Sequence, residues 1–237
     1  MAVKYKRILL KLSGESLAGD RGFGIDMETT RRICEGVKQA YDLGCQMSVV
    51  VGGGNFWRGR DGAAIERTRS DQIGMLGTVM NALAVADMLE QLGVGVRVQT
   101  ALGMQQVAEP YIRNRAVRHM EKGRIVVLAC GTGNPFFSTD TAAALRAAEL
   151  NADIIFKATM VDGVYDKDPK QHRDAVKYND LTFSEVLSQQ LKVMDSTAAT
   201  MCRDNHMPLL VFDISDPGNI AKALEGRVVG TLVSEIK

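Results

Sequence analysis

The alternation of short, β-branched apolar runs with longer segments of helical periodicity constrains the fold of this chain more than any other feature. The segment Asp26–Leu43, for example, places Ile33, Val37 and Ala40 on one helical face, and Gly44 follows as a typical helix end. Strands that alternate with helices predict crossover connections, and therefore a mostly parallel sheet covered by helices on both faces. The expected strands are Lys6–Leu12, Gln46–Val51, Gly95–Thr100, Arg124–Ala129, Asp153–Lys157, Pro208–Asp213 and Arg227–Val233.

Two segments depart from this regular alternation. The polar stretch Ala158–Tyr178 contains Asp162-Gly163, a good hairpin turn, so we interpret the stretch as a β-hairpin excursion from the sheet. The segment Gln72–Ala86 carries no charge and predicts a helix buried on more than one side, either in the core alone or between the core and a subunit interface. Because no linker, repeat or low-complexity tract interrupts the chain, we expect a single domain over residues 1–237.

Charge and cysteine content exclude several classes of protein. Lys and Arg total 29 against 28 Asp and Glu, so no global basic footprint predicts binding to nucleic acid or to a membrane surface. The four cysteines and three histidines show neither C-x-x-C nor H-x-x-x-H spacing, which argues against structural zinc and for reduced thiols. No signal-peptide segment is recognisable, and no apolar stretch is expected to span a membrane, so we predict a cytoplasmic protein.

The loops that follow four of the expected strands carry the chemistry. Because the carboxyl ends of parallel strands meet at one edge of a sheet, these loops are expected to converge there. Their glycines let backbone N–H groups approach a phosphate closely, and lysine and arginine supply positive charge. The four loops are Lys11–Ser16, Gly52–Gly59, Gly131–Asp140 and Lys157–Thr159.

The familiar phosphate and hydrolase motifs do not account for these loops. No G-x-x-x-x-G-K-[ST] sequence is present, so a P-loop is excluded. The dinucleotide fingerprint fails because Trp57 and Phe136 stand where its third glycine is required. There is no G-x-S-x-G elbow for a serine hydrolase.

Phosphoryl transfer fits the same residues better, because its transition state requires cations and oriented N–H groups more than covalent chemistry. Lys11, Arg58 and Lys157 would supply the cations, and Asp140 would hold the two lysines in place. Mg²⁺ would neutralise the remaining phosphate charge. An acceptor that is itself a phosphate, with a second pKa of about 6, is ionised near neutrality and needs no general base.

Five stretches in order then identify a family: RILLKLSGE from Arg7, GGGNFWRG from Gly52, GTGNPFFSTD from Gly131, KATMVDGVYDKDP from Lys157 and LKVMD from Leu191. Along essentially its whole length the chain resembles the bacterial uridylate kinases of the amino acid kinase superfamily. The resemblance implies a three-layer α/β/α sandwich with a mainly parallel central sheet. It also implies Mg²⁺-assisted transfer from ATP to UMP, giving ADP and UDP, in pyrimidine nucleotide synthesis.

The resemblance also assigns the site residues. Catalysis would fall to Lys11, Arg58, Asp140 and Lys157. Asp195 is a candidate for positioning Mg²⁺, which the phosphates would mainly hold. The ATP side would consist of Lys11, Leu12, Ser13, Gly14, Gly54, Arg58, Thr159, Tyr165 and Asp168. The UMP side would consist of Gly53, Asp71, Thr132, Gly133, Asn134, Pro135, Phe136, Phe137, Ser138 and Thr139.

Two of these assignments have simpler alternatives. Asp71 with Ser70 could form the start of the helix that follows, without excluding a ribose contact by Asp71. One of Phe136 and Phe137 could be an ordinary core residue beneath the loop rather than part of the pocket wall.

Members of the family are typically hexamers built from dimers, and in many of them GTP activates and UTP inhibits. The uncharged helix from Gln72 suits a dimer interface. The segment Gly19, Asp20, Arg21, Gly22, Phe23 and Gly24 matches a stretch linked in relatives to the GTP effect, although it could equally be a flexible loop. UTP, a product-like uridine nucleotide, could occupy the acceptor pocket.

Two competing functions remain. Another member of the superfamily would phosphorylate a carboxylate or carbamate with a similar ATP side, but the GTGNPFFSTD loop together with Asp71 favours a nucleotide acceptor. A non-catalytic nucleotide sensor would not need the charges of Lys11, Arg58, Asp140 and Lys157. Their presence therefore argues for catalysis.

Overall fold

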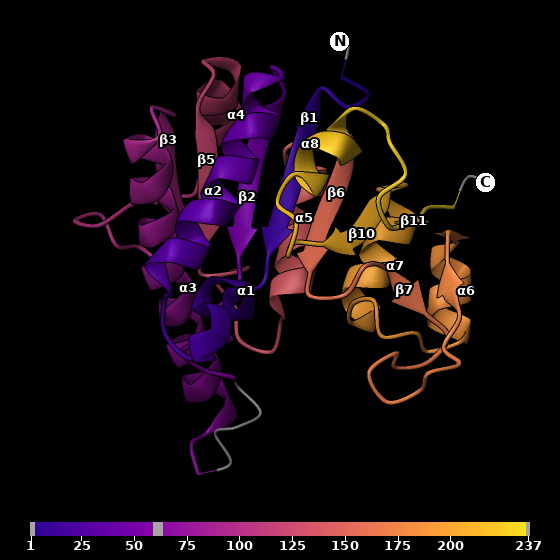
Figure 1. The fold of residues 1–237 in the computed structure, drawn as a ribbon. Coiled ribbons are helices and arrows are strands. Elements are labelled where there is room, and N and C mark those ends of the chain that lie inside the picture. The colour runs from indigo at the N-terminus through magenta and orange to yellow at the C-terminus, as the bar shows by residue number, and fades with distance from the viewer. Residues whose placement is uncertain (1–2, 59–63, 236–237) are drawn as a thin grey trace.

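The computed structural model describes residues 3–58 and 64–235 and is built on one large sheet (Figure 1). Its strands are β1 (Arg7–Leu12), β2 (Gln46–Val51), β3 (Val96–Thr100), β4 (Glu109–Pro110), β5 (Ile125–Ala129), β6 (Ile154–Thr159), β9 (Asp180–Leu181), β10 (Leu209–Asp213) and β11 (Thr231–Val233). The helices are α1 (Gly14–Ala18), η1 (Gly19–Arg21), α2 (Met27–Asp42), α3 (Arg67–Gln91), α4 (Arg113–Glu121), α5 (Thr139–Glu149), α6 (Phe183–Ser188), α7 (Ser196–Asp204) and α8 (Asn219–Leu224).

The sheet has the order β4-β3-β5-β2-β1-β6-β10-β11-β9, and every neighbouring pair is parallel except β10 with β11. The predicted, mainly parallel sheet is therefore confirmed. Of the seven expected strands, six agree with the structure to within two residues. The seventh, Arg227–Val233, is shorter because Gly230 stands just before β11 with a φ of 150°.

Helices cover both faces of this sheet, which confirms the three-layer α/β/α arrangement (Figure 1). Successive residues of a strand point to opposite faces. Accordingly, Ile8, Leu10 and Leu12 of β1 pack into the core beneath α2, α3 and α8, whereas Leu9 packs into the core beneath α4, α5 and α7. Both faces of the central strands are buried, which explains their continuous apolar sequences.

Helix α2 forms where its periodicity predicted. The carboxylate of Asp26 accepts a hydrogen bond from the Thr29 N–H (2.8 Å) and satisfies the first turn. Ile33, Val37 and Ala40 are buried, and Gly44 ends the helix with a φ of 89°.

The excursion after β6 is a hairpin, but its predicted turn is wrong. Strand β7 (Val164–Tyr165) pairs antiparallel with β8 (Lys177–Tyr178), not with the residues before Asp162-Gly163. Asp162 instead accepts hydrogen bonds from the hydroxyl of Tyr165 (2.7 Å) and the ammonium of Lys177 (2.9 Å). These side-chain contacts override the local Asp-Gly signal.

Helix α3 is longer than its uncharged segment and is apolar on two sides. Its inner side is buried in the core, while Leu76, Met80 and Leu83 form an exposed outer apolar face. By length and composition alone α3 could span a membrane, contrary to the prediction that no stretch could. However, 56% of its most apolar window is buried inside the fold, as in the core helix of a soluble protein.

Candidate active site

The centre of the site is a carboxylate between two lysines. Lys11 on β1 and Lys157 on β6 are paired in the parallel register of adjacent strands. Asp140, in the first turn of α5, lies 3.0 Å from the Lys11 Nζ through one oxygen and 2.7 Å from the Lys157 Nζ through the other. Lys157 also donates a hydrogen bond to the carbonyl of Val193. The residue expected to organise both lysines therefore contacts both of them.

The ionisation of this cluster follows from burial and charge. Burial by itself would raise the pKa of Asp140, but the attraction of Lys11 and Lys157 outweighs it and lowers the pKa to about 2. Burial lowers the pKa of Lys157, and the attraction of Asp140 offsets only part of this effect. Asp140 is accordingly a permanent anion near neutrality, which makes it an organiser of cations and not a proton acceptor.

The glycine loop after β2 borders the same site. Gly53 approaches α3 so closely that a Cβ there would lie 2.6 Å from the carbonyl of Gly74, so only glycine fits. Gly54 and Arg58 line the cleft, and the Arg58 guanidinium forms an ion pair with Glu15 of α1. Gly59, the last residue of the predicted loop, lies outside the described residues.

The backbone conformation of the loop between β5 and α5 explains the unusual composition of this loop. Cys130, Gly131, Gly133 and Phe136 all have positive φ, a conformation that glycine adopts most easily. The loop is anchored at one end by the Thr78 hydroxyl of α3, which accepts a hydrogen bond from the Cys130 N–H (2.8 Å). At its other end the hydroxyl of Ser138 caps α5.

Asp71 of α3 holds the tip of this loop. Its carboxylate accepts a hydrogen bond from the Phe136 N–H (2.8 Å) and forms an ion pair with Arg67 (2.8 Å), whose guanidinium lies over the Phe136 ring. Helix α3 begins at Arg67 with Glu66 as its N-cap, so the suggestion that Asp71 and Ser70 start the helix is wrong. The carboxylate of Glu66, and not that of Asp71, accepts hydrogen bonds from the free N–H groups of the first turn, those of Thr68 and Arg69.

The two phenylalanines of the loop are not core residues. Phe136 is 66% exposed and Phe137 is 50% exposed, and both line the cleft. The alternative that one of them fills the core is therefore wrong. An aromatic ring exposed in a cleft offers a stacking or packing surface to a planar ligand.

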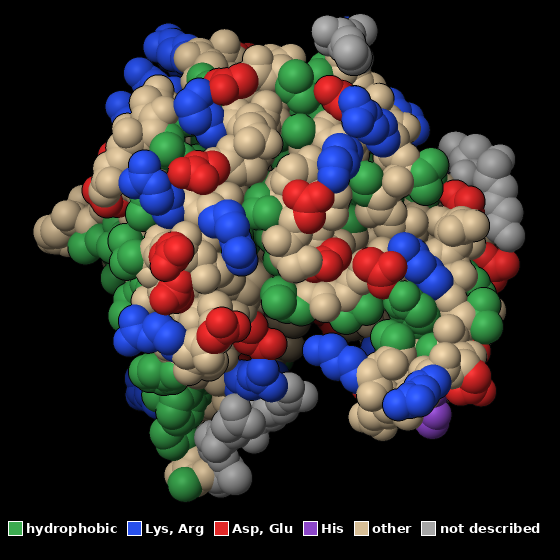
Figure 2. Space-filling view, in the orientation of Figure 1, with side chains coloured by type: hydrophobic (Ala, Val, Ile, Leu, Met, Phe, Trp, Pro, Cys, Tyr) green, Lys and Arg blue, Asp and Glu red, His purple; other side chains and the backbone are tan. Residues whose placement is uncertain are grey.

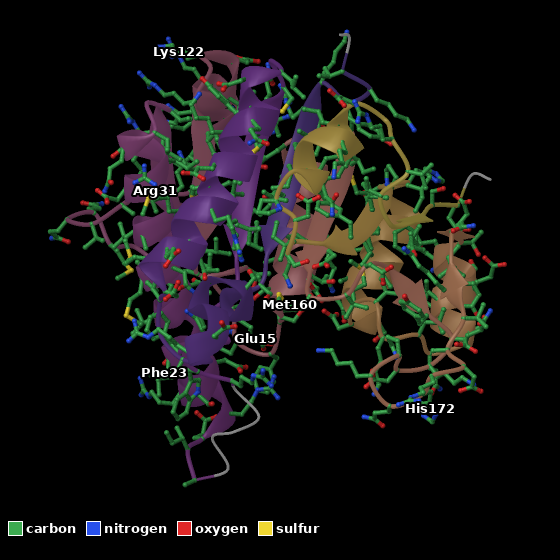
Figure 3. All side chains as sticks on the ribbon, in the orientation of Figure 1. Glu15, Phe23, Arg31, Lys122, Met160 and His172 are labelled. Atoms are coloured by element: carbon green, nitrogen blue, oxygen red, sulfur yellow. The ribbon has the colours of Figure 1, made fainter. Side chains whose placement is uncertain are left out.

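The site comprises two clefts that meet at the charged cluster. The first, of about 780 Å³, is lined by Lys11, Asp140, Asp71 and the loops described above. The second, of about 580 Å³, is lined by Lys157 and by the hairpin. Figure 2 shows a hollow in the molecular surface between the side that carries α1 and the side that carries the hairpin, with charged side chains at its rim. In Figure 3, Glu15 lies on the α1 side of the hollow and His172 on the hairpin side.

The residues predicted for ATP are split between the two clefts, because Lys11, Gly54 and Arg58 line the first cleft together with the residues predicted for UMP. Thr159, Tyr165 and Asp168 all line the second cleft. Gly53, Thr132, Ser138 and Thr139 line the first. Leu12 is buried, Ser13 caps α1 and Gly14 begins that helix, and none of the three is among the residues that line either cleft. Gly133, Asn134 and Pro135 belong to the loop but are not among the residues lining the first cleft.

Asp195 lines the first cleft, but its carboxylate is already engaged. It caps α7 and accepts hydrogen bonds from the hydroxyls of Ser138 and Thr141. Within the described ranges it forms no ion pair with a lysine, and no group of three or more His, Cys, Asp or Glu side chains could hold a metal ion. Protein oxygens at the cleft fit a magnesium ion held mainly by a ligand's phosphates.

The segment Gly19–Gly24 lies beside the glycine loop and is not among the residues that line either cleft. The Gly24 N–H donates to the carbonyl of Asn55 (3.0 Å), and the ring of Phe23 meets that of Phe56 edge-on. Figure 3 shows Phe23 at the surface of this region.

Two charged residues of the site were missed at the sequence level. Glu15 neutralises Arg58, and Arg67 neutralises Asp71. The second pair has the i,i+4 spacing of helical ion pairs, a signal that could have found Arg67. The first joins residues 43 positions apart, and no local spacing reveals it.

Comparison with known proteins places these features in context. Residues 6–213 match the family described as the amino acid kinase family. A solved UMP kinase from Bacillus anthracis is 39% identical over 98% of this chain and 97% of its own, with a TM-score of 0.95. The UMP kinase from Ureaplasma parvum is 36% identical over 98% and 100%, with a TM-score of 0.92. The uridylate kinase from Archaeoglobus fulgidus is 28% identical over 96% and 99%, with a TM-score of 0.73.

The lowered pKa of Asp140 predicts a component of acid stability. A group whose pKa falls on folding stabilises the native state above its unfolded value, and this stabilisation is lost as the pH falls through the folded value. For Asp140 the window runs from pH 4 to pH 2, and the loss is about 2 kcal/mol at 1.4 kcal/mol per pKa unit.

Urea unfolding of the wild type and of Asp140→Asn between pH 5 and pH 2 measures this loss. We expect the difference in free energy of unfolding between the two proteins to shrink by that amount as the pH falls. Asp204→Asn, which removes an exposed carboxylate, controls for the loss of one negative charge. Parallel profiles for the wild type and Asp140→Asn would contradict the assignment.

Proposed function

The chain belongs to the amino acid kinase family, and from this premise we propose that it phosphorylates UMP with ATP as the donor, giving UDP and ADP. The observation that carries the proposal is the meeting of two clefts at Lys11, Asp140 and Lys157. A donor nucleotide in one cleft and an acceptor in the other would bring their phosphates together at these charges. Two solved structures similar over nearly the whole chain are named UMP kinases, which supports UMP as the acceptor.

The proposed mechanism is in-line transfer supported by positive charge. ATP lies in the second cleft against Thr159, Tyr165 and Asp168, with its phosphates extending past Lys157 toward Lys11, the glycine loop and Arg58. Lys11, Lys157 and Arg58 stabilise the charge on the transferring group, and Asp140 keeps the lysines in register. Arg58 exchanges Glu15 for phosphate when the nucleotides bind.

UMP lies in the first cleft between α3 and the loop from Thr132 to Thr139. The Asp71 carboxylate accepts a hydrogen bond from a ribose hydroxyl. The backbone and hydroxyl groups of the loop contact the base and the phosphate, and Phe136 and Phe137 pack against the nucleotide. Because the acceptor phosphate is already ionised near neutrality, no residue of the chain has to remove a proton. The depressed pKa of Asp140 agrees with a site that lacks a general base.

Mg²⁺ would accompany ATP, held mainly by the phosphates. The Asp195 carboxylate accepts hydrogen bonds from Ala198, Ser138 and Thr141, which leaves one of its roughly four acceptor sites for the ion or its water shell. When bound, the ion supplies positive charge that offsets the charge of the phosphates. The chain's own contribution is to orient the nucleotides and the lysines around it.

Regulation by nucleotides belongs to the same proposal. UTP inhibits by placing its uridine in the UMP cleft, since the same groups recognise base and ribose. GTP activates through the segment Gly19–Gly24, which contacts the glycine loop through Gly24 and Phe23. The enzyme acts in the cytoplasm, in pyrimidine nucleotide synthesis.

The exposed apolar face of α3 supports a homo-oligomer, a hexamer built from dimers. Leu76, Met80 and Leu83 lie on one side of the helix and are each more than a third exposed in the isolated chain. Apolar side chains grouped on a helix face are typical of a surface that a second subunit covers.

A panel of acceptors tests the function directly. We expect ADP release from Mg-ATP with UMP and weak or no release with CMP, dTMP, glutamate, aspartate or carbamate. Preference for a carboxylate or carbamate would keep the kinase but overturn the acceptor. ATP binding without turnover on any acceptor would indicate a nucleotide sensor.

Asp71→Ala tests which side of the site is which. Loss of a charged hydrogen-bond acceptor in the UMP cleft should raise the apparent KM for UMP about tenfold or more and change that for ATP little. Asp71→Asn keeps an acceptor for the Phe136 N–H, so its KM for UMP should lie between those of the wild type and Asp71→Ala. A defect selective for ATP would place Asp71 on the donor side.

Met80→Glu tests the assembly. A charge on the outer face of α3 should shift the protein to smaller species in sedimentation velocity, because two such faces would bury like charges against each other. Gln39→Glu, on the exposed side of α2, is the control. An unchanged distribution for Met80→Glu would place the interface elsewhere.

A further inference from the structure

Two buried asparagines connect the glycine loop to the core of α3. Asn55 follows the three glycines, Asn81 lies in the middle of α3, and their exposed fractions are 1% and 0%. Each side chain donates to the other: the Asn55 Nδ2 to the Asn81 Oδ1 (2.9 Å), and the Asn81 Nδ2 to the Asn55 Oδ1 (2.7 Å). This reciprocal amide pair is a closed, two-bond contact between a loop and a rigid helix.

The remaining proton of each amide reaches a backbone carbonyl. The Asn81 Nδ2 donates to the carbonyl of Gly52 (2.7 Å), the first residue of the glycine loop. The Asn55 Nδ2 donates to the carbonyl of Gly24 (2.6 Å), whose own N–H returns a bond to the Asn55 carbonyl. The pair therefore fixes both ends of the turn from Gly52 to Asn55 and attaches the preceding segment to it.

The amide pair also contacts the other loop that follows a central strand. A Cβ on Gly14 would lie 2.4 Å from the Asn55 Oδ1 and 2.8 Å from the Gly52 carbonyl oxygen. The Gly52 N–H in turn donates to the carbonyl of Leu12 (2.9 Å). The backbone after β1 and the backbone after β2 are thus held against each other with Asn55 between them.

An apolar pair could fill the same volume, but it could not fix the orientation of the loop. Each amide proton has its own acceptor, so the four hydrogen bonds are satisfied together in this one arrangement of the three segments. A loop whose backbone groups bind phosphate gains affinity when it is held rigidly in its binding conformation.

We propose that Asn81, acting through Asn55, is a positioning residue that holds the glycine loop and the Leu12–Gly14 backbone at the spacing required by the phosphates of ATP. The inference rests on the proposed function, because it assumes that these loops bind the donor nucleotide. Asn81 does not line either cleft, so its effect passes entirely through the loop.

Asn81→Ala tests the proposal by steady-state kinetics. A loop that holds phosphate equally in the substrate complex and the transition state contributes to KM more than to kcat. We expect the apparent KM for ATP to rise about tenfold, the equivalent of one lost buried hydrogen bond, and kcat to change less than threefold. Asn81→Ser, which keeps a hydroxyl donor and removes less volume, should give a smaller rise.

Met88→Ala is the matched control, because Met88 is a buried residue of the same helix with no hydrogen bond to the loop. It should lower the melting temperature while leaving the KM for ATP within twofold at a temperature where all variants are folded. Wild-type kinetics in folded Asn81→Ala and Asn81→Ser would overturn the proposal, as would an equal rise of KM in Met88→Ala.

Calorimetric titration with ATP separates this inference from the proposed function. If the wild type transfers no phosphoryl group to UMP, the proposed function fails, yet ATP affinity still reports on the loop. Weaker ATP binding by Asn81→Ala than by the wild type and Met88→Ala supports the positioning role. Equal ATP affinity in all three proteins contradicts it.

Discussion

The ion pairs that Asp140 makes with Lys11 and Lys157 are the constraint on which the rest of the site depends. Parallel register places the two lysines side by side on adjacent strands, where their like charges would repel without a counter-ion. That counter-ion comes from α5, and its position depends on the loop between Cys130 and Thr139. The residues of positive φ in the loop and its hydrogen bonds to α3 and to the N-cap of α7 fix the position of Asp140.

The central sheet was predictable because its strands are buried on both faces, which leaves short apolar runs with clear ends. Strand pairs of two residues, such as β7 with β8, leave no such pattern, and the Asp-Gly dipeptide pointed to the wrong turn. The lysines and Asp140 could be found because each stands at the end of an apolar run or the start of a helix. Glu15 could not, since its ion pair with Arg58 depends on how α1 packs beside the glycine loop.

The amide pair shows the same limit inside the core. Asn81 is a single polar residue in an otherwise apolar stretch of helix, and hydrophobic periodicity does not predict a partner for such a residue. Only the fold reveals that it faces Asn55, 26 residues away, and that both amides are satisfied. The chain thus uses glycine for close approach and asparagine to fix the loop that glycine leaves free. Flexible and restraining residues are consecutive in the sequence at Gly54 and Asn55.

Helix α3 presents Asp71, Gly74, Met75 and Thr78 to the first cleft and Leu76, Met80 and Leu83 to the outside, over the same turns. An α-helix moves as a rigid rod over such a distance, so these two surfaces cannot shift independently. Any axial rotation or translation that reshapes the cleft displaces the outer side chains as well. A second subunit resting on the outer face, as in the proposed oligomer, would therefore limit how far the cleft can change shape.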